Sequence, residues 1–249
     1  MATAFISDLH LSSNHPEMIA LFLNFLETYT TQLETLYILG DFFDVWIGDD
    51  ATTDADDTVI QALKRATDKG LKIYFMHGNR DFLVGKNFFK MTGCIFLKDP
   101  CVIELYGKRI LLMHGDTLCT QDIAYLKFRK KTRNWFVKKL FLLKSRNARN
   151  KIATGYRKAS QMHTQTKAEN IMDVTPEEVL RVMEKHHVQT LIHGHTHRPG
   201  IHAFLLNQQP ATRIVLPAWH EQDGAFFCKP DGSQTFVTSG KPLTLSGNL

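Results

Sequence analysis

The sequence predicts an α/β fold in which short buried strands alternate with amphipathic helices. Three strand-like runs lie in the first 80 residues, at residues 5–6, 36–39 and 71–76, and helical patterns separate them. In the first helical pattern, apolar side chains between residues 18 and 26 recur at spacings of three and four. That period belongs to a helix with one buried face. The alternation predicts βαβ units around a largely parallel sheet.

The middle of the chain predicts another helix and a hairpin. The acidic loop at residues 49–57 leads into a helical pattern that ends before Gly70. Two apolar runs, at residues 102–105 and 109–113, then flank Tyr106-Gly107-Lys108. Because two such runs around a short glycine-containing turn are typical of paired strands, we expect a β-hairpin here.

The last third predicts one helix and several strands. Thr175-Pro176-Glu177-Glu178 has the spacing of a capping box, with proline at the first helical position, so a helix should start there and end near His187. Strands are expected at residues 190–192, 213–216 and 224–227. We expect the last two to close a second sheet.

Length and composition limit the possible classes of protein. The 249 residues fit one large domain or one domain with an insertion, and the 43% hydrophobic content excludes a disordered chain. The four cysteines form no C-x-x-C pair, which favours a reduced, cytoplasmic setting. The N-terminus lacks a basic segment, and no apolar run is long enough to cross a bilayer. We expect a protein that is soluble or at most attached to a membrane surface.

The positive charge is concentrated in one segment. The net charge is +5, yet residues 127–151 contain eleven Lys or Arg and no Asp or Glu, so the rest of the chain is net acidic. This basic segment lies within residues 121–170, whose composition is helical and which lack strand patterns. We therefore predict a helical insertion at residues 121–170.

Polar motifs stand directly after five of the predicted strands. They are Asp8-x-His10, Gly40-Asp41, Gly78-Asn79, His114-Gly115 and Gly194-His195-x-His197. Because strand ends in one sheet lie side by side, these groups can share a crevice. Imidazole with carboxylate and amide oxygens, and without thiolate, favours Mn, Fe or Zn in an open catalytic site. Taken alone, each motif is more typical of a strand-ending turn or a structural histidine.

The ordered set resembles the calcineurin-like metallophosphoesterase superfamily, whose pattern is D-x-H, G-D-x-x-D, G-N-x-[DE], H and G-H-x-H. Here the pattern reads Asp8-Leu9-His10, Gly40-Asp41-Phe42-Phe43-Asp44, Gly78-Asn79-Arg80-Asp81, His114 and Gly194-His195-Thr196-His197. The resemblance implies a four-layer α-β-β-α sandwich of two mixed sheets. It also implies a core formed by residues 1–120 and 171–249, with residues 121–170 as a helical cap.

By the same resemblance, the site holds two divalent metal ions, expected to be Mn²⁺, and Asp41 bridges them. The implied ligands of the first ion are Asp8, His10, Asp41 and His197, and those of the second are Asp41, Asn79, His114 and His195. Residues implied to orient the ligands are Asp44, Asp81 and Asp116. His77 and His193 have no ligand role in this pattern and are expected to be structural.

Arg80 indicates the type of phosphoester. Many family members carry histidine at this position, where it can protonate an alkoxide leaving group. Arginine cannot act as a general acid at neutral pH, but it can bind a phosphoryl group with two hydrogen bonds. A phosphate monoester, whose second pKa is about 6, needs little protonation to leave. Arg80 therefore favours cleavage of a pyrophosphate bond.

The predicted insertion supports an acylated substrate. Apolar residues are interleaved with its basic ones: Leu126, Phe128, Trp135, Phe136, Val137, Leu140, Phe141, Leu142 and Leu143. The segment is too apolar for a nucleic-acid surface, so we expect no nucleic-acid partner. A cap with an apolar interior and a basic surface fits an anionic, acylated substrate taken from a membrane. The alternative is a helical pair packed on the core with a solvated basic face.

Together, Arg80 and the basic insertion are similar to the branch of the family that hydrolyses UDP-2,3-diacylglucosamine in bacterial lipid A synthesis. This resemblance implies a peripheral enzyme on the cytoplasmic side of the inner membrane, in which water attacks the α-phosphorus and releases UMP and 2,3-diacylglucosamine 1-phosphate (lipid X). Implied catalytic residues are Asn79, Arg80 and His195. Implied substrate contacts are Asn79, Arg80, Asp122, Tyr125, Phe128, Arg157, Ser160, Thr164, Lys167 and His195, with Thr164 standing where asparagine is expected.

Two other functions remain open from the sequence. One is a dinuclear metallophosphoesterase that acts on soluble nucleotides or phosphoesters. The other is a non-catalytic scaffold of the same fold, which would have no chemical need for the complete ligand pattern.

Overall fold

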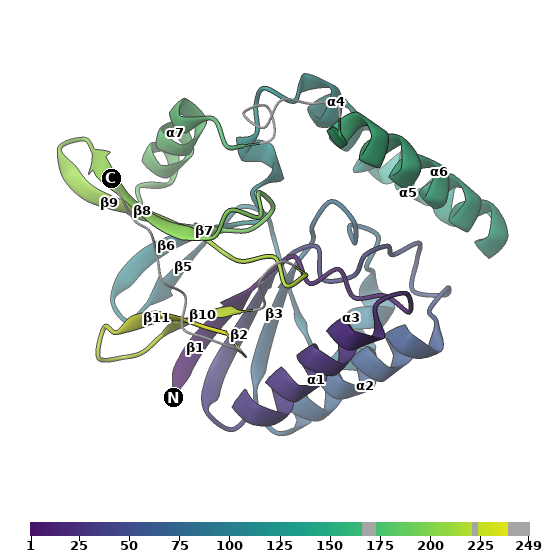
Figure 1. Cartoon of the computed structure of the whole chain (residues 1–249), viewed down its shortest axis with the longest axis horizontal. Helices are drawn as coiled ribbons and strands as arrows, with labels where there is room; N and C mark the ends of the chain where they lie inside the picture. Colours follow the sequence, from purple (N-terminus) through teal and green to yellow (C-terminus); the bar gives the residue numbers. More distant parts are fainter. Residues whose placement is uncertain (166–172, 221–223, 239–249) are drawn as a thin grey trace.

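Two β-sheets face each other at the centre of the protein, with helices on their outer sides (Figure 1). The computed structural model describes residues 1–165, 173–220 and 224–238, and the side chains of residues 158–165 are outside that description. The resulting order of layers is helix, sheet, sheet, helix. The predicted four-layer α/β sandwich of two mixed sheets is therefore confirmed.

The first sheet has six strands in the order β11-β10-β1-β2-β3-β4. Strands β1 to β4 run parallel, while β10 lies antiparallel to β1 and β11. The strands are β1 (Ala2–Ile6), β2 (Leu33–Leu39), β3 (Lys72–Met76), β4 (Ile95–Leu97), β10 (Ala225–Cys228) and β11 (Gln234–Val237). The helices on its outer face are α1 (Pro16–Tyr29), α2 (Asp54–Asp68) and α3 (Lys86–Thr92). The parallel pairing of β1, β2 and β3 brings their carboxyl ends to the same edge.

The second sheet has five strands in the order β5-β6-β7-β9-β8. Strand β7 is parallel to both β6 and β9, and the hairpins β5–β6 and β8–β9 are antiparallel. The elements are β5 (Cys101–Leu105), β6 (Lys108–Met113), β7 (Thr190–His193), β8 (Gly200–Leu206), β9 (Gln209–Val215) and α7 (Pro176–His186). Helix α7 packs Val179, Val182 and Met183 against the outer face of this sheet.

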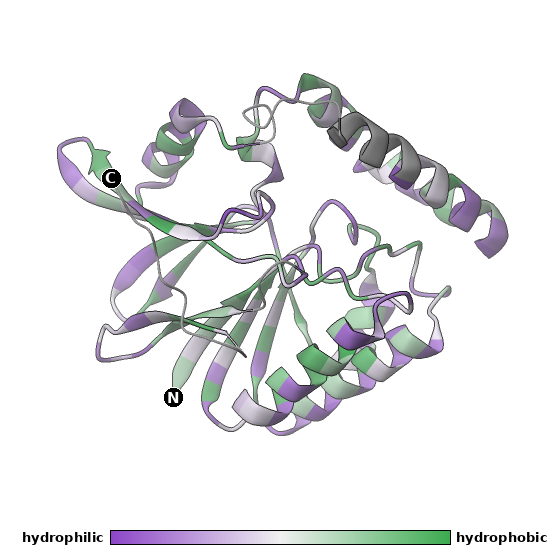
Figure 2. Cartoon of the chain, in the orientation of Figure 1, coloured by the Kyte–Doolittle hydropathy of each residue, from purple (hydrophilic) through white to green (hydrophobic). Residues whose placement is uncertain are grey.

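Side chains alternate between the two faces of each strand, so the core has one layer between the sheets and others between a sheet and its helices. Between the sheets, Phe5, Tyr37 and Met76 share one apolar cluster with side chains of the second sheet such as Leu112 and Ile192. Residues that alternate with them along the first sheet form a larger cluster under α1, α2 and α3: Ala4, Ile6, Leu36, Ile38, Ile73 and Phe75. Figure 2 shows that α1 and α2 carry both hydrophobic and hydrophilic residues along their length, as expected for helices that lie on a sheet.

Three helices occupy the described part of the predicted insertion. They are α4 (Ile123–Thr132), α5 (Trp135–Leu142) and α6 (Arg146–Gln165). Figure 1 shows them together on one side of the molecule, beyond the ends of the strands. Arg149 of α6 is 1% exposed and donates hydrogen bonds of 2.8 Å to the Ile47 carbonyl and to Asp50 of the core. The division of the chain into core and cap at residues 121–170 stays a prediction.

Two details of the sequence prediction are wrong. Strand β10, expected in the second sheet, pairs with β1 in the first sheet, where Phe226 packs in the cluster between the sheets. Thr175 precedes α7, but its hydroxyl makes no capping hydrogen bond. Instead it lies 2.6 Å from the hydroxyl of Thr120, joining the chain before α4 to the chain before α7. Within the described residues, no helix is long and apolar enough to cross a membrane.

Phe42 offers a test of how far the core supports the loop after β2. Its fully buried ring lies with its centroid 4.9 Å from that of Phe22 and 5.6 Å from that of Phe75. Phe42→Ala should lower the free energy of unfolding by about 3–5 kcal/mol, because a large cavity replaces these contacts. Urea denaturation followed by circular dichroism measures the loss. Phe136→Ala, at a ring that is 54% exposed, is the control and should cost less than about 1 kcal/mol; equal losses would contradict this account of the core.

Candidate metal centre

Five loops that follow strands of both sheets converge on one site. The loops after β1, β2 and β3 come from the first sheet, and those after β6 and β7 come from the second. The expectation that all five strand ends belong to one sheet is therefore wrong. Hydrogen bonds join the loops directly, since the Asp8 amide donates to the Gly40 carbonyl at 3.0 Å and the His195 amide donates to Asp8 Oδ2 at 2.8 Å. The site lies at the edge where the two sheets meet.

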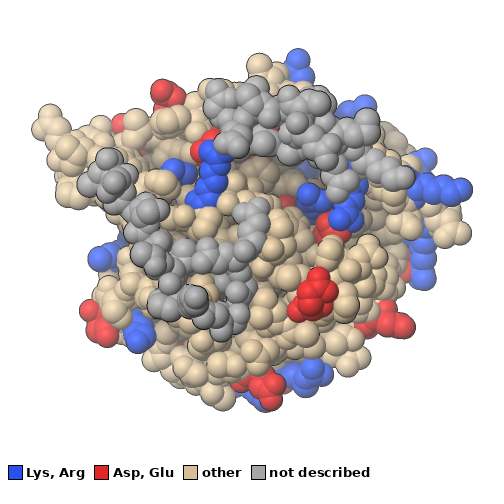
Figure 3. Space-filling model, in the orientation of Figure 1, with Lys and Arg blue, Asp and Glu red and all other residues tan. Residues whose placement is uncertain are grey.

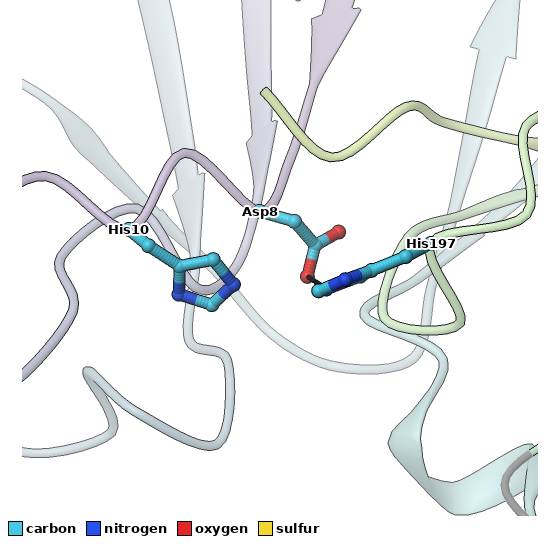
Figure 4. A group of neighbouring side chains, drawn as sticks. All are labelled: Asp8, His10 and His197. Atoms are coloured by element: carbon cyan, nitrogen blue, oxygen red, sulfur yellow. Dashed lines mark ion pairs between the residues drawn. The ribbon is translucent and has the colours of Figure 1, made fainter. Parts of the chain in front are cut away.

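Asp8, His10 and His197 form the first group of candidate ligands. Their donor atoms all lie within 4.8 Å of one another. Figure 4 shows Asp8 between the two imidazoles, with its carboxylate directed toward His197; Asp8 Oδ1 is 3.6 Å from His197 Nε2. Both ring nitrogens of His10 and Oδ1 of Asp8 are buried without a hydrogen-bond partner in the described part of the chain. Buried polar atoms of this kind need a partner, and a metal ion would supply one.

Asp41, His114 and His195 form the second group, again with donor atoms within 4.8 Å of one another. His114 Nε2 lies 3.8 Å from Asp41 Oδ1 and 3.0 Å from Asn79 Oδ1, so Asn79 joins this group. The other ring nitrogen of His114 donates to the Leu39 carbonyl at 2.9 Å. That bond directs Nε2 toward the site, as is usual for metal-binding histidines. All seven predicted ligands are thus brought together, while the bridging role of Asp41 stays a prediction.

The backbone of the site is held in an unusual conformation. Five of the candidate ligands have positive φ angles between 51° and 72°: Asp8, His10, Asp41, His195 and His197. Residues other than glycine rarely adopt this left-handed region, and each instance costs about 1–2 kcal/mol. Such strain persists only where the surrounding structure enforces it, and it concentrates at functional sites. The fold therefore loses some stability in order to direct these side chains into the site.

Two glycines allow the loops to approach one another. A Cβ atom at Gly78 would stand 2.1 Å from the backbone nitrogen and the Oδ1 atom of Asp41. A Cβ atom at Gly194 would stand 2.2 Å from Oδ2 of Asp8. Any side chain at either position would displace a candidate ligand, which explains why glycine precedes the asparagine and the histidine of these motifs.

Burial keeps two imidazoles neutral. It lowers the pKa of His10 to about 3, and together with the charge of His114 it lowers the pKa of His195 to about 4. Near pH 7 both rings therefore have a lone pair that a metal ion can use. Burial alone would raise the pKa of Asp8, but the neighbouring His197 and His114 outweigh burial and hold that pKa below its ordinary range.

Asp41 and His114 form a buried pair of a carboxylate and an imidazole, whose atoms Oδ1 and Nε2 lie 3.8 Å apart. Burial raises the pKa of Asp41, and the nearby Asp8 adds to the effect. Burial would lower the pKa of His114, but the carboxylates of Asp41 and Asp116 outweigh it and raise that pKa. Metal binding displaces protons from such groups. The donor set of imidazole, carboxylate and amide oxygen, without thiolate, fits a divalent transition metal.

Three further aspartates surround the candidate ligands. Asp81 accepts hydrogen bonds from the amides of Phe42 at 2.8 Å and Gly78 at 2.6 Å, so it joins the loops after β2 and β3. Asp44 pairs with Arg80 of the core at 3.4 Å and with Arg157 of α6.

The third, Asp116, contacts α4. It accepts a hydrogen bond from Tyr125 and another, at 2.6 Å, from Arg129. Arg133, just after α4, donates to the Gly78 carbonyl at 2.8 Å. The sequence did not indicate these arginine contacts, because the partners lie 13 and 55 residues away and no local spacing encodes them.

Most of the predicted substrate contacts lie around this centre. Asp122 accepts a hydrogen bond from the Tyr125 amide at 3.1 Å, and the Tyr125 ring stacks with His195 at a centroid distance of 6.2 Å. Phe128 packs against Tyr156, with ring centroids 5.0 Å apart. Ser160 and Thr164 lie on α6 with side chains outside the described atoms, and Lys167 lies outside the described residues.

The two histidines that were expected to be structural each form a hydrogen bond with a backbone carbonyl. His77 Nε2 lies 2.9 Å from the Val84 carbonyl, and His193 Nδ1 lies 2.8 Å from the Gly194 carbonyl. His220, which the sequence analysis did not single out, has its ring 5.0 Å from that of His197 and 5.7 Å from that of His10. It follows β9, so a histidine after a sixth strand was the signal that could have identified it.

Comparisons with known proteins found relatives of about half-identical sequence. UDP-2,3-diacylglucosamine hydrolase of Pseudomonas aeruginosa is 49% identical over 236 residues, which are 93% of this chain and 97% of the relative. The protein of that name from Marinobacter nauticus is 51% identical over 221 residues, 89% and 91% of the two chains. The one from Enterobacter sp. is 49% identical over 239 residues, 96% of each. A solved archaeal phosphodiesterase overlaps at a TM-score of 0.47 and 12% identity, covering 96% of this chain and 99% of that one, a likeness too low to bear on function.

The family itself follows from a match to a family model. A model of the calcineurin-like phosphoesterases matches residues 1–199, which include all five motifs and both groups of candidate ligands. Relatives of about half-identical sequence cover nearly the whole chain. The chain therefore belongs to the calcineurin-like phosphoesterase family.

Proposed function

We propose that the chain hydrolyses the pyrophosphate bond of UDP-2,3-diacylglucosamine and releases 2,3-diacylglucosamine 1-phosphate and UMP. The observation that carries this proposal is the 49% identity to a relative named for that substrate. The match covers 93% of this chain and 97% of the relative. The convergence of seven candidate ligands on one edge of the sandwich supplies the chemistry for a metal-dependent hydrolase. In this reaction a water oxygen bonds to the α-phosphorus, and the bond from that phosphorus to the bridging oxygen breaks.

The metal centre is proposed to hold two Mn²⁺ or other divalent ions. One ion would be held by Asp8, His10 and His197, the other by Asn79, His114 and His195, with Asp41 shared. When bound, such ions lower the pKa of water and neutralise phosphoryl oxygens. The orphaned nitrogens of His10 support this assignment, because within the described residues no protein group satisfies them.

Arg80 is proposed to bind the phosphoryl group that is attacked. Its backbone amide donates to Asp41 Oδ1 at 2.8 Å, which fixes the residue beside the metal centre. Its guanidinium lies 3.4 Å from Asp44 and remains about one-third exposed, so it is available to an anion. His195 and Asn79 would contact the same phosphoryl group, and these fixed donors would stabilise the charge that develops as the sugar phosphate leaves.

The cap helices are proposed to bind the diacyl sugar. Arg157 of α6 and Arg80 of the core share the carboxylate of Asp44, so basic groups from both parts meet at the edge of the metal centre. Tyr125 and Phe128 provide aromatic surface nearby, and Asp122, Ser160, Thr164 and Lys167 are the further proposed contacts. Because its substrate is a lipid, we place the protein at the cytoplasmic side of the bacterial inner membrane as a peripheral enzyme.

The two other candidate functions are less well supported. An enzyme for soluble phosphoesters would not explain arginine at position 80 or an apolar, basic insertion. A scaffold would not explain two groups of ligand atoms held in strained left-handed conformations.

Asp41→Asn tests the metal centre. The amide keeps the size of the carboxylate but loses its charge, so metal content should fall and kcat/KM should drop by at least about 100-fold. Burial disfavours the charged form of Asp41, so a neutral amide of the same size should be tolerated there. The circular dichroism spectrum should therefore stay unchanged. Metal content is read by mass spectrometry of protein purified without chelator. The matched control is Asp231→Asn, in an exposed turn beside Gly232, which should retain both properties; full metal content in Asp41→Asn would contradict the assignment.

The position of water attack can be read with an isotope. Hydrolysis in water enriched in oxygen-18 with Mn²⁺ should place the label in UMP, because attack at the α-phosphorus leaves the new oxygen on the uridine side. Mass spectrometry of both products makes the measurement. Label found in the sugar phosphate would overturn the assigned site of attack.

A substrate panel separates the three candidate functions. The protein should hydrolyse UDP-2,3-diacylglucosamine at least about 100-fold faster than its deacylated form or an aryl phosphate, since the acyl chains supply most of the binding area. Measurement of kcat/KM for each compound decides the matter. Equal rates on all three would favour a hydrolase of soluble phosphoesters, and no activity with no bound metal would favour a scaffold.

A further inference from the structure

The outer side of α5 is an exposed apolar surface. It is made of Trp135, Phe136 and Leu140 of the helix and of Leu143 directly after it, which are 71%, 54%, 49% and 74% exposed. We call these four residues the α5 face. Large apolar side chains that gather in this way on a water-soluble surface usually mark a site of interaction.

The α5 face points outward because the opposite side of the helix is fixed to the core. Phe141 packs against the apolar cluster beneath α1 and α2. Lys138 donates a hydrogen bond of 2.7 Å to the Phe82 carbonyl, and its ammonium lies 5.7 Å from the centroid of the Phe82 ring. The helix therefore cannot rotate its apolar residues inward without breaking these contacts.

Uncompensated positive charge lies on α5 and on the neighbouring helix α4. Some basic residues of the cap bind core groups, as Arg133 binds the Gly78 carbonyl and Arg149 binds Asp50. The exposed lysines that make no ion pair within the described residues include Lys130, Lys131, Lys139 and Lys144. In Figure 3, Lys and Arg gather on the side of the molecule where Figure 1 places α4 to α6. A hollow of about 480 Å³ beside the face has both basic and apolar walls. It is lined by Arg133, Trp135, Lys138, Lys139, Leu142 and Leu143.

We propose that the α5 face docks onto a bilayer surface that carries anionic lipids. Trp135 and its apolar neighbours would enter the boundary between headgroups and acyl chains, where amphipathic aromatic rings are favoured. The lysines would lie against lipid phosphates. This surface deepens the proposed function, on which it rests, because it would place the cap against the membrane that supplies an acylated substrate.

Tryptophan fluorescence tests the contact directly. Trp135 is 71% exposed, whereas Trp46 and Trp219 are each 4% exposed, so changes in emission on binding report on Trp135. Vesicles of phosphatidylcholine with phosphatidylglycerol should shift the emission to shorter wavelength, and brominated acyl chains should quench it. Pure phosphatidylcholine vesicles should do neither, and added salt should weaken the effect. No shift and no co-sedimentation with the anionic vesicles would overturn the proposal, and an acidic protein partner would then be the better explanation of the face.

Matched variants locate the contact. Leu140→Ser with Leu143→Ser should weaken co-sedimentation with anionic vesicles by at least about tenfold, because interfacial binding scales with buried apolar area. Leu205→Ser, at a β8 residue that is 69% exposed and far from the cap in sequence, should bind as the unchanged protein does. Equal losses in the two variants would overturn the assignment of the face.

The two proposals fail in different ways. Hydrolysis is measured on UDP-2,3-diacylglucosamine dispersed in detergent, where no bilayer is needed. Vesicle binding without this hydrolysis would reject the proposed substrate and leave the docking surface standing. Hydrolysis by a protein that does not bind anionic vesicles would reject the docking surface alone.

Discussion

The structure depends on two buried carboxylates, Asp8 and Asp41, held among imidazoles at the edge shared by the two sheets. Burying a carboxylate is costly unless hydrogen bonds and opposite charge compensate it. Here the amides of His195 and Arg80 donate to the two carboxylates, and His197 and His114 lie beside them. Since these partners come from both sheets, the polar groups that would bind metal also join the two halves of the sandwich.

The cap extends this network outward. Asp44 lies three residues after Asp41 and Asp116 two residues after His114, and the carboxylates of both bind arginines of α6 and α4. Arg133 adds a bond to Gly78, whose backbone lies against Asp41. A change in the position of α4 or α6 would therefore shift residues that lie within three positions of the candidate ligands. Together, these contacts fix α4 and α6 against the loops that carry the candidate ligands.

The candidate ligands could be predicted because they stand in short motifs after strands, as in Asp8-x-His10 and His195-x-His197, and because the ordered set resembles a known family whose ligands match these positions. The sequence also predicted the alternation of the first strands and helices, since periodicity is a local signal. The place of β10 could not be predicted, because pairing with β1 is decided some 220 residues away by packing between the sheets. Thr175 failed as a capping residue for a similar reason: its partner, Thr120, lies 55 residues earlier in the chain.

The hydrogen bond from the His195 amide to Asp8 joins residues 187 positions apart. During synthesis, Asp8 leaves the ribosome long before β7 and its two histidines exist. Neither group of candidate ligands can be complete until that last portion has been translated. Any metal ion that needs a full group could therefore be held only after β7 has been made. Chain order would thus place metal loading late in biosynthesis.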